Sequence, residues 1–381
     1  MFKNNLRQYG MVIALILITA LFWFLTDGII LKPLNLTNLI AQNGFILVLA
    51  IGMVLVIITG NIDLSVGSIV AFVGAIAGVL IITHGVPIWV AVLVSLVVGA
   101  LIGIWQGFWV AYMGIPSFIV TLAGMLIFRG LTLYLLGGQS LAPFPRSFQM
   151  IGNGFLPDIV DGSSVHVLTI LLGIFFSILL IVLEYRKRKE GSHLQQEPVH
   201  FGWSLLRLAL LIAVINWFAW ILAMNKGVPI VLVIVLVLII VYSFIMNNTV
   251  MGRHIYATGG NRKAADLSGI KTKKVVFWVF VNNGVLAALA GLMFASRLNS
   301  ATPKAGDMLE LDAIASVFIG GASMAGGVGT VVGAVVGGLV MGVMNNGMSL
   351  IGVGIDWQMA IKGLVLLAAV GFDVYNKNKA N

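Results

Sequence analysis

The sequence predicts an all-α protein that crosses a membrane many times. Of its 381 residues, 60% are hydrophobic and only 9% are charged, with a mean hydropathy of +1.08. An ordinary soluble domain has about a quarter of its residues charged. Apolar runs of membrane-spanning length also recur along the whole chain. Glycine is abundant, at 45 residues, which is typical of membrane helices whose backbones pack closely.

About twelve membrane-spanning helices are expected from these runs. The first run follows Lys3 and Arg7 and contains no small-residue cleavage site, so we expect a retained span that begins in the cytoplasm. The run at 312–324 is too short to cross comfortably and is followed by Gly326 and Gly327, which indicates a half-helix or a broken span. The runs cover residues 10–30, 38–59, 65–83, 88–111, 117–136, 165–183, 204–223, 228–246, 275–295, 312–324, 328–348 and 357–372.

The distribution of Lys and Arg predicts the orientation of the spans, because cytoplasmic loops carry an excess of these residues. When the runs are threaded alternately, fourteen basic residues fall on the side of the two chain ends and five on the other side. Both termini are therefore expected in the cytoplasm of a multi-pass protein. Orientation accounts for the net charge of +9, so the charge does not call for nucleic-acid binding.

Several kinds of chemistry are excluded or left without a motif. The absence of cysteine excludes disulfides and thiolate sites, and the five His residues form no HxxxH pair, so no metal site is expected. No GxxxxGK[ST] motif occurs, and the glycines at 320–321 and 326–329 lack the strand and the lysine of a phosphate loop. We therefore expect no catalytic residue and no cofactor on this chain.

The polar stretch at 247–275, NNTVMGRHIYATGGNRKAADLSGIKTKKV, stands out between two long apolar runs. Gly259 and Gly260 permit a turn, Asn261 is a suitable N-cap, and Gly269 can end a helix. The positive-inside rule accounts for the six basic residues of the stretch, but topology does not require small residues at fixed offsets. The pattern favours a short amphipathic helix that forms a docking surface.

This stretch, together with GNIDLSVGS at 60–68 and ELDAIASVFIGGASMAGG at 310–327, resembles the permease subunit of bacterial monosaccharide ABC importers, the ribose, galactose and xylose class. The resemblance covers most of the chain. It implies a permease subunit in the bacterial cytoplasmic (inner) membrane that forms a homodimer. The implied partners are an ATP-binding ABC subunit, which would hold ATP and Mg, and an extracytoplasmic sugar-binding protein. The segment 259–269 would then be the coupling helix that docks on the ATPase.

The residues expected at this ATPase contact are small or polar, and Ala264 and Ala265 are expected to offer a small apolar face. The full set is Gly259, Asn261, Ala264, Ala265, Ser268 and Gly269.

Family members usually have ten spans, which makes the pair at 165–183 and 204–223 an insertion of the kind found in the xylose branch. The whole chain is thus expected to be one transmembrane permease domain, 1–381. It would consist of a first half (1–164), an inserted pair (165–223) with a cytoplasmic loop at 184–203, and a second half (228–381). Val97–Ala100 followed by Gly103 matches Val331–Ala334 followed by Gly337, which indicates inverted repeats around a core of about ten helices. Convergent glycine-rich composition would give the same match.

Polar residues inside apolar runs are costly and indicate either a path for solute or structural bonds. Arg129 is interpreted as a strut that pairs with Asp63 or Asp312, and Asp63 as a cap of the helix that follows it. The full set of such residues is Asp63, Ser65, Arg129, Asn282, Asn283, Asp312, Asn345 and Asn346.

Two other functions remain open at this stage. A secondary transporter would couple a small polar solute to protons through Asp63 or Asp312, and uptake would then stop when a protonophore is added. A membrane enzyme acting on lipids ranks last, because no cluster of His, Asp and Ser is evident.

Overall fold

The computed structural model describes residues 2–160, 165–193 and 201–378. The described chain is built of helices, with two isolated antiparallel bridges, one between Leu141 and Ala301 and one between Phe155 and Pro229. The elements are α1 (Phe2–Leu25), η1 (Ile29–Leu31), α2 (Pro33–Ile58), α3 (Val66–Gly78), the π-helical turn η2 (Val79–Thr83), α4 (Ile88–Ala111), α5 (Ser117–Leu136), α6 (Arg146–Asn153), α7 (Val167–His193), α8 (Phe201–Ala223), α9 (Ile230–Asn248), α10 (Val250–Gly260), α11 (Arg262–Leu267), α12 (Thr272–Leu298), α13 (Leu309–Ile319), α14 (Val331–Leu350) and α15 (Ile355–Asn378).

Ten helices in the described ranges are long and apolar enough to cross a membrane. They coincide with ten of the twelve predicted runs, so the prediction of an all-α polytopic membrane protein is confirmed. The two remaining runs fall on α1, whose apolar part covers Gly10–Leu25, and on α13. Residues 194–200 of the predicted loop at 184–203, and Lys379, lie outside the described residues.

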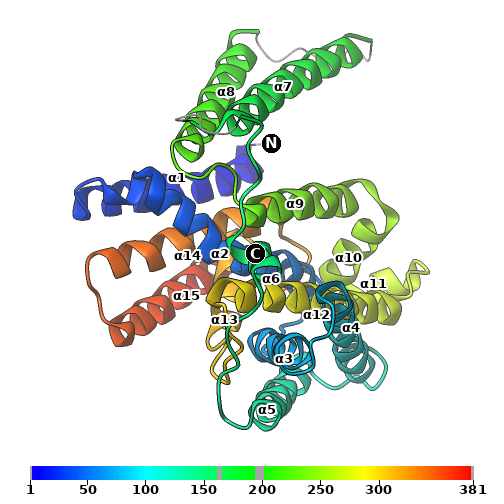
Figure 1. Ribbon diagram of the computed structural model, residues 1–381. Helices are drawn as coiled ribbons and strands as arrows, with labels where there is room; N and C mark the ends of the chain where they lie inside the picture. Colours follow the sequence, from blue (N-terminus) through cyan, green and yellow to red (C-terminus); the bar gives the residue numbers. More distant parts are fainter. Residues whose placement is uncertain (1, 161–164, 194–200, 379–381) are drawn as a thin grey trace. The chain divides into compact units, whose positions relative to one another are not determined.

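The chain divides into two compact units. The first comprises residues 1–30, 39–154 and 231–381, and the second comprises 31–38 and 155–230. The second unit contains α7 and α8, which pack side by side as a hairpin (Figure 1). Asn216 of α8 donates a hydrogen bond to Ser177 of α7 at 2.7 Å, the kind of bond that holds apolar helices together in a membrane.

Helix α12 is the centre of the first unit and packs against α2, α3 and α4 (Figure 1). The contact with α4 is made by backbone atoms, because glycine stands where the helices cross. A Cβ on Gly99 would lie 2.5 Å from the carbonyl oxygen of Gly284, and one on Gly103 would lie 2.5 Å from that of Phe280. Gly337 of α14 meets α13 in the same way, 1.9 Å from the carbonyl oxygen of Ser316. These glycines therefore allow close packing between helices of the same chain.

The predicted half-helix is confirmed, because α13 has only 11 residues. At 1.5 Å per residue it covers about 16 Å, half of a hydrocarbon layer of about 30 Å. The other half, residues 301–308, is a non-helical segment with turns that runs along α3. Ala301 lies beside Gly78, and Gly306 lies beside Gly67, eleven residues nearer the start of α3. The segment 301–319 thus crosses as one broken span, a form known from transporters.

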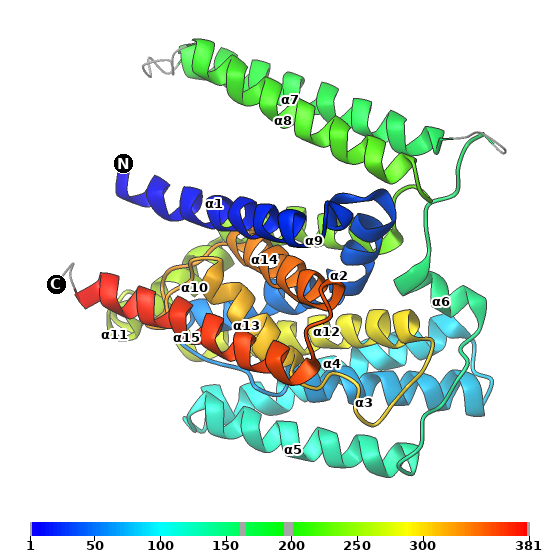
Figure 2. The same cartoon turned by 90° about the vertical axis from the view of Figure 1, so that its left-hand side faces the viewer.

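The beginning of α1, the end of α15 and helices α10 and α11 lie at the same end of the first unit (Figure 2). This end is called the α10–α11 end below. The opposite end holds the Leu141–Ala301 bridge and the last turns of α5 and α12.

Candidate functional site: the coupling segment and the polar clusters of the spans

The segment α10–α11 has the local geometry that the sequence predicts. Asn261 is the N-cap of α11, and its Oδ1 accepts the backbone N–H of Ala264 at 3.0 Å. Helix α11 ends at Leu267, and Gly269 follows with φ +85°, a left-handed conformation that glycine adopts without steric cost. The N–H of Ile270 bonds to the carbonyl of Ala265 at 3.0 Å and closes the helix end. The short helix is therefore held by its own caps.

The apolar face of α11 differs from the expected one. Ala264 and Ser268 are exposed, but Ala265 is only 5% exposed. The prediction that Ala264 and Ala265 together present a small apolar face is wrong for Ala265, because this side of the short helix turns inward. The side chain that protrudes is Leu267, which is 91% exposed. The sequence pattern did not single out this exposed leucine.

Backbone contacts connect α10 to the end of α2 and to the 320–330 loop. A Cβ on Gly259 would lie 1.6 Å from the carbonyl oxygen of Ile58, the last residue of α2. The same carbonyl accepts the N–H of Gly327 at 2.8 Å. Tyr256 of α10 donates its hydroxyl to the carbonyl of Gly329 at 2.8 Å. Helix α10 is therefore in direct contact with the end of α2 and with the loop between α13 and α14.

A first polar cluster surrounds Asp63, which is 1% exposed. Its Oδ1 accepts the backbone N–H of Ser65 at 2.8 Å and the hydroxyl of Ser65 at 2.6 Å, just before α3 begins. Its Oδ2 accepts the amide of Asn283 at 2.8 Å. Gln106 of α4 donates to the Ser65 hydroxyl at 2.6 Å. Gln106 is a residue that sequence reasoning missed, although a lone glutamine in an apolar helix is itself a signal.

A second cluster lies on α13. Lys362 of α15 contacts both carboxylate oxygens of Asp312 at 3.1 Å. Asp312 is thus paired with Lys362, and Arg129 instead donates to the carbonyls of Pro303 and Ala305, at 3.2 and 2.6 Å. The expectation that Arg129 pairs with Asp63 or Asp312 is wrong.

Two of the predicted asparagines lie outside these clusters. Asn282 accepts the hydroxyl of Tyr242 of α9, on a different side of α12 from Asn283. Asn346 is half-buried on α14. The predicted polar residues therefore form two clusters and some separate hydrogen bonds. The structure does not bring them together along one continuous path.

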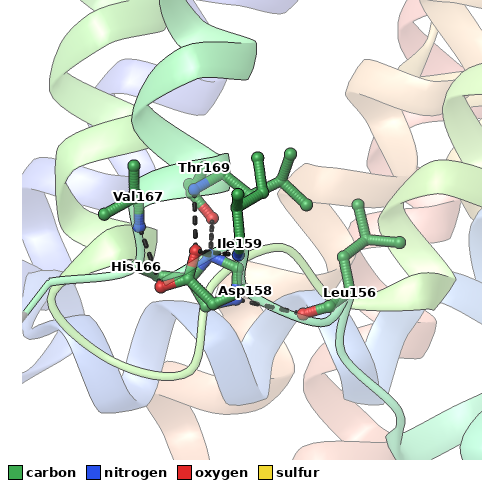
Figure 3. A network of polar contacts seen from close by, with 7 residues as sticks. Leu156, Asp158, Ile159, His166, Val167 and Thr169 are labelled. Atoms are coloured by element: carbon green, nitrogen blue, oxygen red, sulfur yellow. Dashed lines mark hydrogen bonds and ion pairs between the residues drawn. The ribbon is translucent and has the colours of Figure 1, made fainter. Parts of the chain in front are cut away.

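The second unit contains a polar network before α7 (Figure 3). Asp158 accepts the N–H groups of Val167 and Leu168 at 3.0 and 2.9 Å, where α7 begins. These bonds, first that of Leu168 and then those of Val167 and Ile159, together with the charge of His166, lower the pKa of Asp158 to about 2. His166 contacts Asp158 at 3.7 Å. Residues 161–164, between Asp158 and His166, lie outside the described residues.

A family model described as "Branched-chain amino acid transport system / permease component" matches residues 35–370. The xylose transport system permease protein XylH of Haemophilus influenzae is 41% identical over 375 residues, which cover 98% of each chain. XylH of Escherichia coli K12 is 39% identical over 99% of this chain and 94% of its own length. The ribose import permease protein RbsC of Bacillus subtilis is 33% identical over 98% of this chain and 94% of its own length. No solved structure matches.

Proposed function

Because this chain belongs to the permease component family of branched-chain amino acid transport systems, we propose that it is the membrane-spanning subunit of an ATP-driven importer of a monosaccharide. The relatives are named for xylose and ribose, and the greater identity to the xylose permeases favours xylose or a related sugar. The protein works as a homodimer in the bacterial inner membrane. A sugar-binding protein delivers the sugar on the outer side, and a separate ATPase supplies the energy.

The α10–α11 segment is the site where the ATPase docks. The observation that carries this proposal is the combination of an exposed contact surface with rigid contacts behind it. Leu267 and Ala264 face outward, while Gly259 touches the end of α2. An apolar side chain on a short helix fits a groove of a partner protein. Closure of the ATPase would push α11, and the push would reach α2 and α13 through Ile58 and Gly327.

The orientation follows from the same site. If the ATPase docks on α10–α11, this end of the first unit is cytoplasmic, and the basic loop residues support that side. The beginning of α1 and the end of α15 lie on the same side of the first unit as α10 and α11 (Figure 2), which supports a cytoplasmic position for both termini. The helix pair at 165–223 is an insertion between two inverted halves, 1–164 and 228–381. Gly259, Asn261, Ser268 and Gly269 shape the docking helix rather than contact the ATPase through side chains.

Reconstitution in proteoliposomes tests the function. The chain, its ATPase and its binding protein are incorporated, and uptake of labelled xylose is measured with ATP, without ATP and with ATP plus a protonophore. We expect uptake that requires ATP hydrolysis and is unaffected by the protonophore. Uptake that continues without ATP hydrolysis, or that the protonophore abolishes, would contradict the proposal and favour the proton-coupled secondary transporter.

A further inference from the structure

A cavity of about 650 Å³ opens at the end of the first unit that is opposite to α10 and α11. It lies between the last turns of α5 and the non-helical residues 302–307 that precede α13. Its polar lining consists of Arg129, Ser140, Thr302, Lys304 and Asp307. Its apolar lining comes from Leu133 and Pro303. None of these residues belongs to the coupling segment or to either polar cluster described above.

We propose that this cavity is the first binding site on the permease for the incoming sugar. The inference rests on the proposed function. Each hydroxyl of a monosaccharide donates one hydrogen bond and accepts others. The cavity offers both kinds of partner, since Arg129 and Lys304 only donate, the Asp307 carboxylate only accepts, and the hydroxyls of Ser140 and Thr302 do both. The apolar edges of Leu133 and Pro303 suit the C–H faces of a sugar ring.

Arg129 has hydrogen-bonding capacity for a ligand. Its Nη1 donates to the carbonyls of Pro303 and Ala305, at 3.2 and 2.6 Å. A guanidinium has five N–H donors in a fixed fork, and in the described part of the chain no further acceptor is bonded to its other nitrogens. Because the two carbonyls fix the position of the guanidinium, these donors point in a defined direction and need little reorganisation on binding.

A buried acidic side chain lies next to the segment that lines the cavity. Glu310, in the first turn of α13, is 8% exposed, and its Oε2 has no hydrogen-bond partner among the described residues. A Cβ on Gly67 would lie 2.2 Å from Oε2 of Glu310 and 2.3 Å from the carbonyl oxygen of Gly306, the residue before Asp307. Asp312 follows on the same helix. A hydroxyl-rich solute that leaves the cavity would therefore meet further acceptors along α13, the element that contacts the coupling segment through the loop after it.

A lipid phosphate is the competing ligand, since Arg129 and Lys304 are both cationic. Phosphate oxygens accept hydrogen bonds and carry negative charge, so Asp307 in the lining would repel them and find no donor. The hydroxyls of a neutral sugar can accept hydrogen bonds from Arg129 and Lys304 and donate one to Asp307. The mixed lining therefore favours the sugar, and the experiment includes the lipid as a separate arm.

The natural chain contains no cysteine, which allows a direct test by substrate protection. Ser140→Cys places one thiol in the cavity, and Met150→Cys, on α6 at the same end of the unit and 50% exposed, is the matched control. Each variant is labelled with a membrane-impermeant maleimide in proteoliposomes, with and without xylose. At a xylose concentration about ten times the dissociation constant, labelling of Ser140→Cys should be about tenfold slower, because only empty sites react. Labelling of Met150→Cys should not change.

A second variant tests the lining chemistry. Asp307→Asn in the Ser140→Cys background replaces the one carboxylate among the described lining residues. The amide oxygen still accepts a hydrogen bond but carries no charge, so the half-protecting xylose concentration should rise about tenfold. Xylose that leaves labelling unchanged while ATP-dependent uptake persists would overturn the cavity assignment and leave the proposed function intact. Protection by anionic phospholipid and not by xylose would overturn it in favour of a lipid site. Loss of both protection and ATP-dependent uptake would refute the proposed function, and the cavity assignment with it.

Discussion

Substituting Gly259 with alanine should uncouple transport from ATP hydrolysis. The new Cβ would lie 1.6 Å from the carbonyl oxygen of Ile58 and 2.7 Å from the N–H nitrogen of Gly327. Both neighbours are backbone atoms and cannot rotate away. Because ordinary contact begins near 3.4 Å, the helix ends must separate by about 1.8 Å. Overpacking of this kind costs about 1–3 kcal/mol, and losing the bond from Gly327 to Ile58 adds about 1 kcal/mol.

The chain provides a matched control at the next residue. A Cβ on Gly260 would meet nothing within 4 Å, so Gly260→Ala should behave as the natural protein does. The assay measures xylose taken up per ATP hydrolysed in proteoliposomes, together with thermal stability of the permease in detergent. A cost of about 2–4 kcal/mol at the contact predicts at least a tenfold lower ratio for Gly259→Ala, with ATPase binding retained. Equal ratios for the two variants would refute the coupling route through Ile58.

Three further predictions concern other parts of the chain. Leu267→Asp should weaken co-purification of the ATPase without reducing membrane insertion, because the side chain is fully exposed; unchanged co-purification would remove Leu267 from the interface. Lys362→Met should destabilise the protein by about 3 kcal/mol in thermal unfolding, since it leaves the buried Asp312 carboxylate unpaired, and adding Asp312→Asn should restore much of the loss; no rescue would argue against the pair. The pKa of Asp158 near 2 means that its stabilising bonds are complete above about pH 4 and are lost as the pH falls toward 2. Asp158→Asn should abolish this pH dependence in unfolding measurements between about pH 5 and pH 2, and an unchanged profile would contradict the role of Asp158.

Local features were predictable because they depend on neighbouring residues. The cap at Asn261 and the helix end before Gly269 follow from short-range hydrogen bonding and backbone freedom. The ten long spans follow from run length. The brevity of the 312–324 run likewise predicted a broken span, since eleven helical residues cannot cross the bilayer.

The face that α11 presents could not be predicted in the same way. A helix of six residues is too short to show a periodic pattern. Whether Ala265 or Leu267 turns inward is decided by the elements packed behind the helix, and hydrophobicity alone would have buried the leucine. The exposed leucine fits the proposed contact with the ATPase.

The partner of Arg129 was also hidden from the sequence. Its acceptors are backbone carbonyls of Pro303 and Ala305, more than 170 residues away. Every residue carries such a carbonyl, so no side-chain type marks the contact. By contrast, Gln106 could have been found, because an amide inside an apolar helix needs a partner, and the hydroxyl of Ser65 supplies one.

The broken span has a consequence for how the protein is made. Residues 301–308 have a few turn hydrogen bonds, such as that from Ala305 to Thr302, but lack the continuous bonds of a helix, and lipid offers no partner to the peptide groups that remain. Arg129 of α5 bonds two of these carbonyls, and α3 lies against Gly306. Both helices are synthesised before residue 301. We therefore expect the segment to leave the translocon and pack against α3 and α5, which are already in the membrane. Loss of Arg129 should then first reduce the amount of correctly inserted protein.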